Sequence, residues 1–184
     1  MIIKWQGGMS GTTDDTLRYN IDLCPTVADL LGVQKAKNWD GESYAPAIKD
    51  GTPCPRDYLV LSQMAHVCQR SVVFGDWLYL RTYHDGYHNF PREMLYNIGK
   101  DPHEEHNVAA EHPEICDKAA HMLLDWFDDC MMNSPQPTDP MQTVLREGGP
   151  YHTRGNLGLY CSFLEKTERA DEAERLRARH PNEK

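Results

Sequence analysis

A series of expected strands in the middle of the chain constrains its fold more than any other feature. Residues 70–74 and 77–83 are rich in β-branched and aromatic side chains, and they flank the pair Gly75-Asp76. A Gly-Asp pair between two such runs is typical of a two-residue β-hairpin. Apolar runs over 57–62 and 93–97 predict two further strands. We therefore expect a small antiparallel sheet of about four strands.

A long amphipathic helix is expected directly after these strands, over residues 113–133. Pro113 suits the first position of a helix, and apolar side chains then recur at helical spacing. They are Ile115, Ala119, Met122, Leu123, Trp126, Phe127 and Cys130. Such a stripe covers one face of a sheet, so the sequence predicts an α+β fold in which this helix packs on the strands.

The N-terminal residues predict a smaller strand–helix segment. Residues 1–5 form a short apolar run that suits a buried strand, and residues 22–31 predict a helix followed by Gly32. The apolar face expected to be buried contains Leu23, Val27, Leu30 and Leu31. A strand and a helix without a larger sheet would expose apolar surface, so we also expect self-association or poor solubility.

Proline and glycine residues between positions 33 and 56 predict a connector. Residues 157–166 and 171–179 predict two short helices, the second with a thin apolar stripe of Ala173 and Leu176 that suggests a solvated helix. The expected organisation has three parts: an N-terminal edge, a sheet-and-helix domain, and an irregular and helical tail. Their bounds are 1–50, 51–133 and 134–184.

Acidic residues outnumber basic ones, since 28 Asp and Glu against 19 Lys and Arg give a net charge of −9. A general nucleic-acid binder would need a basic stripe, and an anionic membrane surface would also attract positive charge. Neither partner is expected. Residues 1–5 do not begin a signal peptide, so a cytoplasmic location is expected if Met1 is the true start. If translation starts upstream of Met1, the sequence does not determine the compartment, and an exported protein is one of the alternatives.

Histidine and cysteine residues supply the candidates for chemistry. His84 and His88 share an expected loop with Asp85, and His103 and His106 share a turn with two glutamates. Imidazole with carboxylate is a ligand set that zinc and other divalent metals accept. The alternative for both groups is hydrogen-bonded or solvated histidine.

Cys68 is the best-spaced candidate nucleophile, because His66, Cys68 and Arg70 would share one face of a strand. The alternative is a small buried residue at the start of a strand. The six cysteines include no C-x-x-C pair, which excludes a zinc ribbon. Their wide and irregular spacing does not favour a disulfide framework.

Five short motifs occur in a fixed order between residues 2 and 110. They are IIKWQG at 2–7, DLCPTVADLLG at 22–32, WDGESYAPAI at 39–48, VFGDWLY at 73–79, and EMLYN at 93–97 followed by DPHE and NVA. Together they resemble the C-terminal part of a type I sulfatase, in the alkaline phosphatase superfamily. Gln6 stands where that family has proline.

The resemblance implies a sulfuric-ester hydrolase whose catalytic residues lie outside this chain. Residues 1–50 are then expected to be the C-terminal edge of its α/β catalytic domain, kept as a strand–helix remnant, and residues 51–133 its C-terminal subdomain. Sulfatases use a formylglycine made from C-x-P-x-R or S-x-P-x-R, and neither motif occurs here. Calcium and formylglycine are therefore expected only in a full-length relative, and this chain is expected to hold no catalytic residue, metal or cofactor of its own. Its expected partners are the missing catalytic domain or a second copy of itself, and a sulfated small molecule or glycan in a complete enzyme.

Any pocket function is expected in the loops and strand ends. The candidates for substrate binding are His66, Arg70, His84, His88, His152 and Arg154. Arginine and donating histidine are what an anionic sulfate group needs. The alternative has solvated histidines and an Arg70 that pairs with a carboxylate. Two other functions stay open: a stand-alone, non-catalytic binding or assembly module, and a metal- or thiol-dependent enzyme built on the histidine and cysteine loops.

Overall fold

The computed structural model describes residues 1–135 and 138–183, with mixed α and β structure of the α+β class expected from the sequence. Two compact units divide the chain, Met1–Leu59 and Val60–Lys184. The three-part organisation expected from the sequence stays a prediction. Within the described residues, no helix combines the length and the apolar character that a membrane span needs.

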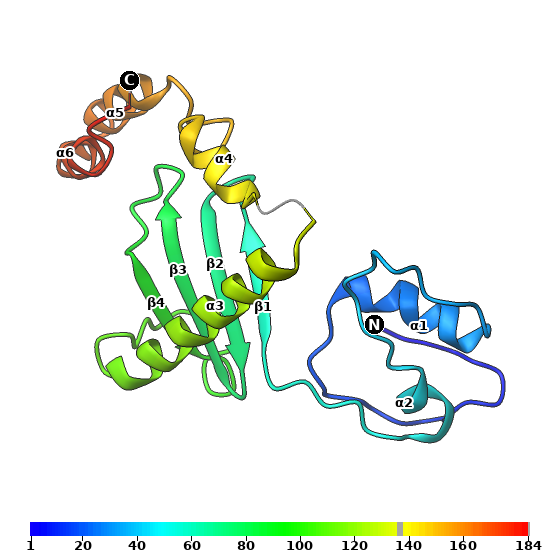
Figure 1. The fold of residues 1–184 in the computed structure, drawn as a ribbon. Helices are drawn as coiled ribbons and strands as arrows, with labels where there is room; N and C mark the ends of the chain where they lie inside the picture. The colour runs from blue at the N-terminus through cyan, green and yellow to red at the C-terminus, as the bar shows by residue number, and fades with distance from the viewer. Residues whose placement is uncertain (136–137, 184) are drawn as a thin grey trace. The chain divides into compact units, whose positions relative to one another are not determined.

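A four-stranded antiparallel sheet, in the order β1-β2-β3-β4, confirms the expected strands (Figure 1). The strands are β1 (Leu59–Gln63), β2 (Cys68–Phe74), β3 (Trp77–His84) and β4 (Glu93–Asn97). Gly75 and Asp76 join β2 to β3 with Phe74 opposite Trp77, so the predicted hairpin is present. Gly75 adopts a φ of +52°, which the tight turn requires and which glycine accepts without strain.

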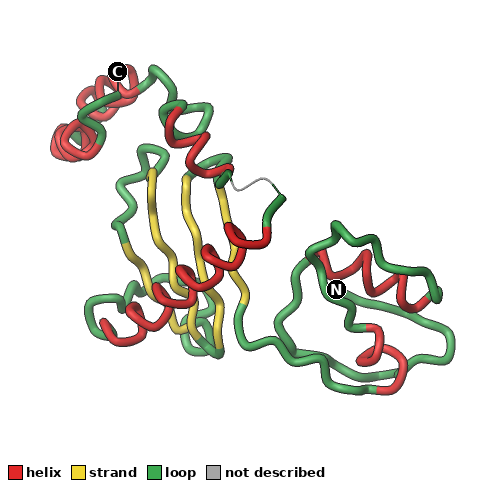
Figure 2. Tube along the Cα trace, viewed as in Figure 1, coloured by secondary structure: helices red, strands yellow, loops and turns green. Residues whose placement is uncertain are grey.

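Helix α3 (Pro113–Asn133) crosses one face of this sheet, as Figure 2 shows, and begins at the predicted proline. Its contact face packs on β2, where Arg70 lies 5.2 Å from the centroid of Trp126 and Lys118 lies 5.4 Å from that of Phe74. The predicted stripe is buried or half-buried from Ile115 to Phe127, whereas Cys130, near the end of the helix, is exposed.

Among the described residues, α3 is followed by α4 (Pro140–Arg146), α5 (Leu157–Lys166) and α6 (Ala170–Arg179). Helix α4 lies in a region expected to be irregular, and the Asp139 side chain caps it by accepting a hydrogen bond from the backbone N–H of Met141. The expectation of a solvated α6 is wrong. Ala173 and Leu176 are fully buried against α5. Two helices that pack side by side can bury even a thin apolar stripe between them.

The first unit contains η1 (Asn20–Asp22), α1 (Leu23–Leu30) and α2 (Ala45–Asp50), connected by long loops. The strand expected over residues 1–5 is absent, and Ile2 in that segment is 99% exposed. A strand needs a neighbour for its backbone hydrogen bonds, and the described residues 1–58 contain no strand.

Helix α1 buries a different face from the one that its apolar spacing predicts. Thr26 and Ala28 are buried, whereas Leu23, Val27 and Leu31 are exposed. Polar contacts orient the helix: the Thr26 hydroxyl donates to the carbonyl of Asp22 over 2.6 Å and accepts from the backbone N–H of Tyr44 over 3.1 Å.

Asp22 links the start of α1 to Glu42 and Arg56, which lie later in this unit. It is fully buried, pairs with Arg56 at 2.5 Å and accepts the backbone N–H of Glu42 at 2.8 Å. Burial opposes ionisation of this carboxyl, but the hydrogen bonds from Arg56 and from the backbone lower the pKa of Asp22. The apolar face expected to be buried therefore lies on the surface of the unit.

Candidate functional site at the histidine-rich end of the sheet

The loop between β3 and β4 positions most of the candidate residues. His84 ends β3, and residues 85–88 follow in a turn. Gly86 adopts a φ of +61° and lies so close to the β1–β2 loop that a Cβ there would overlap the carbonyl oxygen of His66. Glycine is required at this point, and its close approach brings His88 next to His66.

His66, His88 and His152 meet at this end of the sheet and form a group that we call the histidine trio. One ring nitrogen of each lies within 4.8 Å of the others, and all three side chains are exposed. The ring centroids of His66 and His88 are 4.6 Å apart, and His66 stacks on His152 at 5.1 Å. The three residues come from three separate loops, so their spacing in sequence carries no sign of the cluster.

The trio is built from imidazoles without a carboxylate among them. Burial, together with the charges that His66 and His152 would carry, lowers the pKa of His88. The Nε2 atom of His152 lies 3.3 Å from the carbonyl oxygen of Gly86, which orients that ring. Neutral imidazoles in this arrangement can donate N–H groups to an anion or offer nitrogen lone pairs to a metal.

A second group lies beside the trio, and we call it the buried ion network after its three buried members, His84, Asp85 and His180. Glu183, which is half-buried, and Arg179, which is partly exposed, complete it. His180 lies 2.9 Å from Asp85 and 2.7 Å from Glu183, and Arg179 also pairs with Asp85. These contacts attach the end of α6 to the β3–β4 loop.

Hydrogen bonds set the protonation of both histidines in the buried ion network. His84 Nδ1 accepts the backbone N–H of Gly86 at 3.0 Å, so its proton is on Nε2, which donates to Glu183 at 3.0 Å. Burial lowers the pKa of His84, in keeping with a neutral ring.

His180 faces a carboxylate at each of its two ring nitrogens. Burial opposes the charge of His180, but the hydrogen bond to Asp85 and the charge of Glu183 raise its pKa. Desolvation would raise the pKa of Asp85, but the bonds from His180 and Arg179 lower it to about 2.

The two candidate arginines are each held by a carboxylate. Arg70 is 9% exposed and lies 2.6 Å from Asp139, which is the pairing that the alternative interpretation expects. Arg154 is half-buried and lies 2.8 Å from Glu147. Of the six candidates, the structure therefore brings His66, His88 and His152 together at the surface, and it places Arg70 and His84 inside with internal partners.

Cys68 does not have the setting of a nucleophile. It is fully buried, and burial raises the pKa of its thiol to about 11, so little reactive thiolate forms at neutral pH. The strand begins only at Cys68, which leaves His66 in the preceding loop, away from a face shared with Arg70. The structure confirms the alternative, a small buried residue at the start of a strand.

The described residues contain three groups that could hold a metal ion. They are the histidine trio, the set His84, His180 and Glu183, and the exposed set Asp101, Glu105 and His106. Calcium takes about six to eight oxygen ligands. None of these groups offers more than two carboxylates, and Asp101 already accepts the backbone N–H groups of Glu105 and His106. These groups do not fit the calcium that the resemblance implies.

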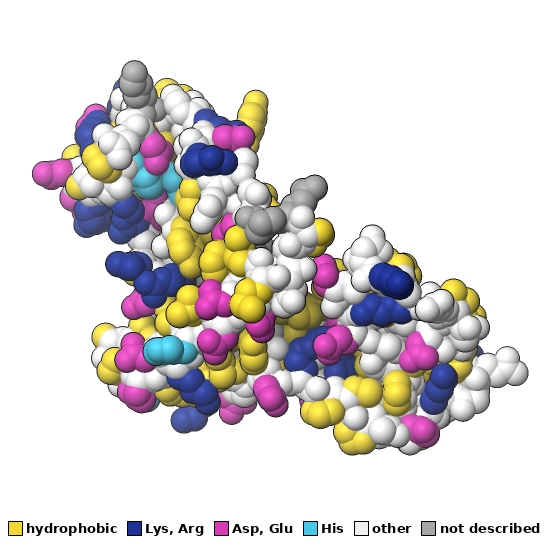
Figure 3. Space-filling view, viewed as in Figure 1, with side chains coloured by type: hydrophobic (Ala, Val, Ile, Leu, Met, Phe, Trp, Pro, Cys, Tyr) yellow, Lys and Arg dark blue, Asp and Glu magenta, His cyan; other side chains and the backbone are white. Residues whose placement is uncertain are grey.

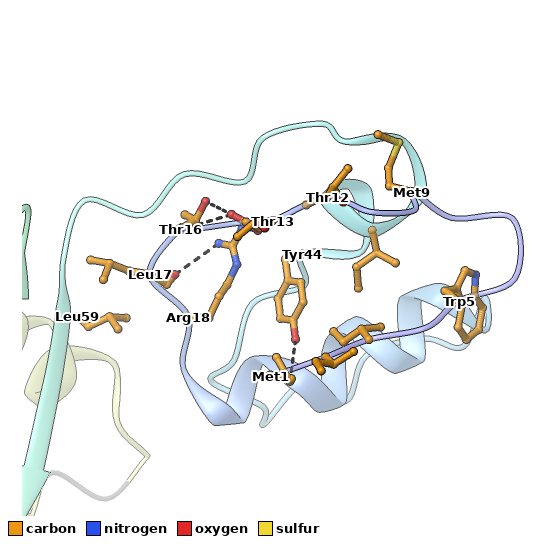
Figure 4. A pocket seen from close by; sticks show the side chains of 15 residues that line it. Met1, Trp5, Met9, Thr12, Thr13, Thr16, Leu17, Arg18, Tyr44 and Leu59 are labelled. Atoms are coloured by element: carbon orange, nitrogen blue, oxygen red, sulfur yellow. Dashed lines mark hydrogen bonds and ion pairs between the residues drawn. The ribbon is translucent and has the colours of Figure 1, made fainter.

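A cavity of about 640 Å³ lies within the first unit, and Figure 4 shows Arg18 and Tyr44 in its lining. Arg18 pairs with Asp14 at 2.9 Å, donates to the carbonyl of Cys54 at 2.6 Å and lies 5.0 Å from the ring centroid of Tyr44. Its charge is thus neutralised internally. On the face drawn in Figure 3, acidic and basic side chains are interspersed.

Comparisons with known proteins relate the chain to sulfatases, although no protein-family model matches it. Arylsulfatase K of Danio rerio is 30% identical over 117 residues, which cover 58% of this chain and 22% of that protein. A solved 2-O GAG sulfatase aligns with a TM-score of 0.50 and 23% identity over 71% of this chain and 29% of its own. A phosphonate monoester hydrolase from Silicibacter pomeroyi aligns with a TM-score of 0.50 and 19% identity over 71% and 28%.

The chain thus spans between 22% and 29% of the length of these relatives. The solved structures show that the fold is shared, and the curated relative matches in sequence. The resemblance of this chain to the type I sulfatases, inferred from its ordered motifs, is therefore confirmed.

Proposed function

We propose that the chain is the C-terminal portion of a sulfatase-family sulfuric-ester hydrolase. It contributes to the fold and to the substrate pocket, and it is catalytically incomplete alone. The observation that carries this proposal is the match to arylsulfatase K over 58% of the chain but only 22% of the relative, in a sequence without the formylglycine motif.

The chemistry of sulfuryl transfer also supports the proposal that the catalytic step takes place outside this chain. Charge that develops on the transferred group must be stabilised by a metal or by clustered cations. Arg70, Arg81 and Arg154 are each paired with a carboxylate, at 2.6, 2.5 and 2.8 Å. Cationic groups held in this way are poorly suited to stabilise a transition state, so we assign the transfer step to the part of the enzyme that precedes this chain.

The contribution to the pocket is assigned to the histidine trio and to Arg154, which follows His152 by two residues in the same loop. These side chains are exposed or half-buried, lie in loops, and can donate hydrogen bonds to a sulfated small molecule or glycan. Arg70 and His84 act instead as positioning residues, through Asp139 and Glu183. A sulfate ester is favoured over a phosphonate because the sequence match is to a sulfatase, while the fold is common to both classes.

An activity assay tests the incompleteness. The purified chain, supplied with calcium and an aryl sulfate, is expected to show no turnover above a buffer blank. Turnover that survives a second purification would overturn the proposal.

Kinetics of a complete enzyme that contains this segment test the pocket role. His88→Ala and His152→Ala are expected to raise KM several-fold and to change kcat less, because they remove binding and not chemistry. His121→Ala, at an exposed position on α3, serves as the matched control. If both trio variants have the same kinetics as the parent enzyme on every sulfated substrate tried, the trio does not contribute to the substrate pocket.

The alternative is a stand-alone binding or assembly module. The exposed apolar face of α1, with Leu23, Val27 and Leu31, is the observation that favours it. The coding sequence immediately upstream of Met1 separates the two functions: a C-x-P-x-R or S-x-P-x-R motif there supports the sulfatase portion, and the absence of both supports the module.

A further inference from the structure

We propose that the histidine trio binds a divalent transition metal ion, with zinc as the preferred ion. This site is separate from the calcium that the sulfatase resemblance implies, and it does not rest on the proposed function. Three neutral imidazoles are a ligand set that zinc accepts readily, with a fourth position left for water or an anion.

The distances between the rings suit this ion. With Zn–N bonds of about 2.0–2.1 Å, tetrahedral geometry places the ligand nitrogens about 3.3 Å apart. The trio already holds one nitrogen of each ring within 4.8 Å of the others. All three side chains are exposed and can rotate the remaining distance without disturbing the core.

The backbone that carries the trio is fixed by contacts between its three loops. The hydroxyl of Tyr87, the neighbour of His88, lies 2.8 Å from the carbonyl oxygen of Thr153, the neighbour of His152. Gly86 meets the carbonyl of His66, as described above, and ties the third loop to the other two. A site that is already assembled loses little conformational entropy when the metal binds.

The hydrogen bonds of the rings also favour a metal. Within the described part of the chain, the rings of the trio form one hydrogen bond, between His152 Nε2 and the carbonyl oxygen of Gly86. A metal-ligating histidine commonly donates its second ring nitrogen to a backbone carbonyl in this way, which fixes the tautomer and leaves Nδ1 with a lone pair. The net charge of −9 on the chain further favours a cation.

The other two metal-capable groups are weaker candidates. In the buried set, the nitrogens of His84 and His180 are already bonded to Glu183 and Asp85. In the exposed set, Asp101 accepts two backbone N–H groups at 3.2 and 2.9 Å. The trio is the group whose ring nitrogens can turn to a metal without breaking an ion pair.

Equilibrium dialysis and calorimetry with Zn²⁺ alone test the site. The chain is used without a polyhistidine tag and with a non-thiol, non-chelating reductant that keeps its six cysteines reduced. One equivalent of zinc is expected to bind per chain. Each single variant, His66→Ala, His88→Ala or His152→Ala, is expected to weaken binding at least ten-fold, and the triple variant is expected to abolish it.

The matched control replaces three exposed histidines outside the trio, His103, His106 and His121, by alanine. This variant is expected to keep the parent affinity. Cobalt titration adds a second readout, since tetrahedral Co²⁺ gives visible absorption in the parent and control chains and none in the trio variant. A zinc-dependent rise in melting temperature is expected in the same two chains, and circular dichroism verifies that every variant folds.

Two results would overturn the proposal. In the first, the parent chain binds zinc no more tightly than the trio variant. In the second, the control variant no longer binds one zinc ion per chain tightly, whereas the trio variant still does. Because the probe is the metal alone, a chain that binds no zinc would not contradict the sulfatase proposal. Likewise, an activity assay that overturns the sulfatase proposal would not contradict the metal site.

Discussion

At the scale of single residues, Asp85 has the most demanding environment among the candidates. Its carboxylate is fully buried and accepts from Arg179 and His180 at the same time. A buried carboxylate needs such partners, because its charge is otherwise unpaired and desolvated. Asp85 therefore helps to hold the end of α6 against the β3–β4 loop, together with the apolar packing of α6 on α5.

Asp85→Asn is expected to destabilise the second unit by about 1–3 kcal/mol, because a buried, charged hydrogen-bond acceptor is lost while His180 keeps its contact with Glu183 and Arg179 stays partly exposed. Hydrogen exchange of peptides from β3 and α6 in increasing urea measures the change. Asp171→Asn is the control, since Asp171 is 70% exposed and pairs with Arg175 on the surface. Equal effects of the two substitutions would contradict the assigned role.

The same network predicts a pH dependence with two limits. The pKa of Asp85 is lowered to about 2, so its contribution is present above its ordinary pKa and is lost as the pH falls toward 2. The pKa of His180 is raised, so its contribution is complete below its ordinary pKa and is lost as the pH rises through the raised value. The stability difference between the parent chain and Asp85→Asn should therefore be largest in mildly acidic solution. A difference that does not change with pH would contradict this assignment.

Gly86 and Gly75 offer a second comparison between single residues. Both have positive φ, but an added Cβ meets the carbonyl of His66 at Gly86 and open space at Gly75. Gly75→Ala is expected to cost about 1–2 kcal/mol for the left-handed backbone. Gly86→Ala should cost more and should also weaken zinc binding, because the loops must separate. Thermal melts and the zinc titration measure both effects, and equal melting temperatures with equal zinc affinity would refute the close approach.

At the scale of elements, the pairing of α5 with α6 determines where the C-terminal part of the chain lies. Leu157, Cys161 and Leu164 from α5 meet Ala173 and Leu176 from α6, and Tyr87 from the β3–β4 loop joins this core. Tyr87 takes a φ of +69°, uncommon for a bulky residue, inside this core. The helical pair thus supports the loop that carries His88.

Leu176→Ala is expected to destabilise this helical pair by about 2–5 kcal/mol, because it leaves a cavity at a fully buried site. Leu159→Ala, at a 74% exposed position on α5, should change stability by less than about 0.5 kcal/mol. Limited proteolysis after residue 156 is expected to be faster only for Leu176→Ala. Similar cleavage of both variants would mean that α6 is not docked.

At the scale of the whole molecule, the first unit has large apolar side chains on its surface. Val27 is 42% exposed and Leu31 is 63% exposed, on the face of α1 that the spacing assigns to a core. Exposed apolar patches of this kind promote association.

The isolated chain is therefore expected to self-associate, and Val27→Asp with Leu31→Asp should reduce light scattering and hydrophobic-dye binding. Leu159→Asp with Phe163→Asp, at exposed positions of α5, is the matched control and should reduce both less. A parent chain that is monomeric and binds no dye would contradict the expectation.

Local patterns alone determined the sheet, the hairpin and the long helix. Gly75-Asp76 predicts its turn and Pro113 predicts the start of α3, because turn chemistry and helical spacing act over a few neighbouring residues. The ordered motifs also determined the relation to sulfatases, which the match to arylsulfatase K confirms. These features need no knowledge of which distant segments meet.

Only the tertiary structure decided which candidate residues meet. His66 and His152 are far apart in sequence, and no local pattern shows that Gly86 brings their loops together. The partner of Asp85 is His180, 95 residues later, and the buried face of α1 follows from Thr26 and Asp22 and not from its leucines. Such contacts depend on loop closure and on the burial of paired polar groups, which arise only when the whole chain is folded.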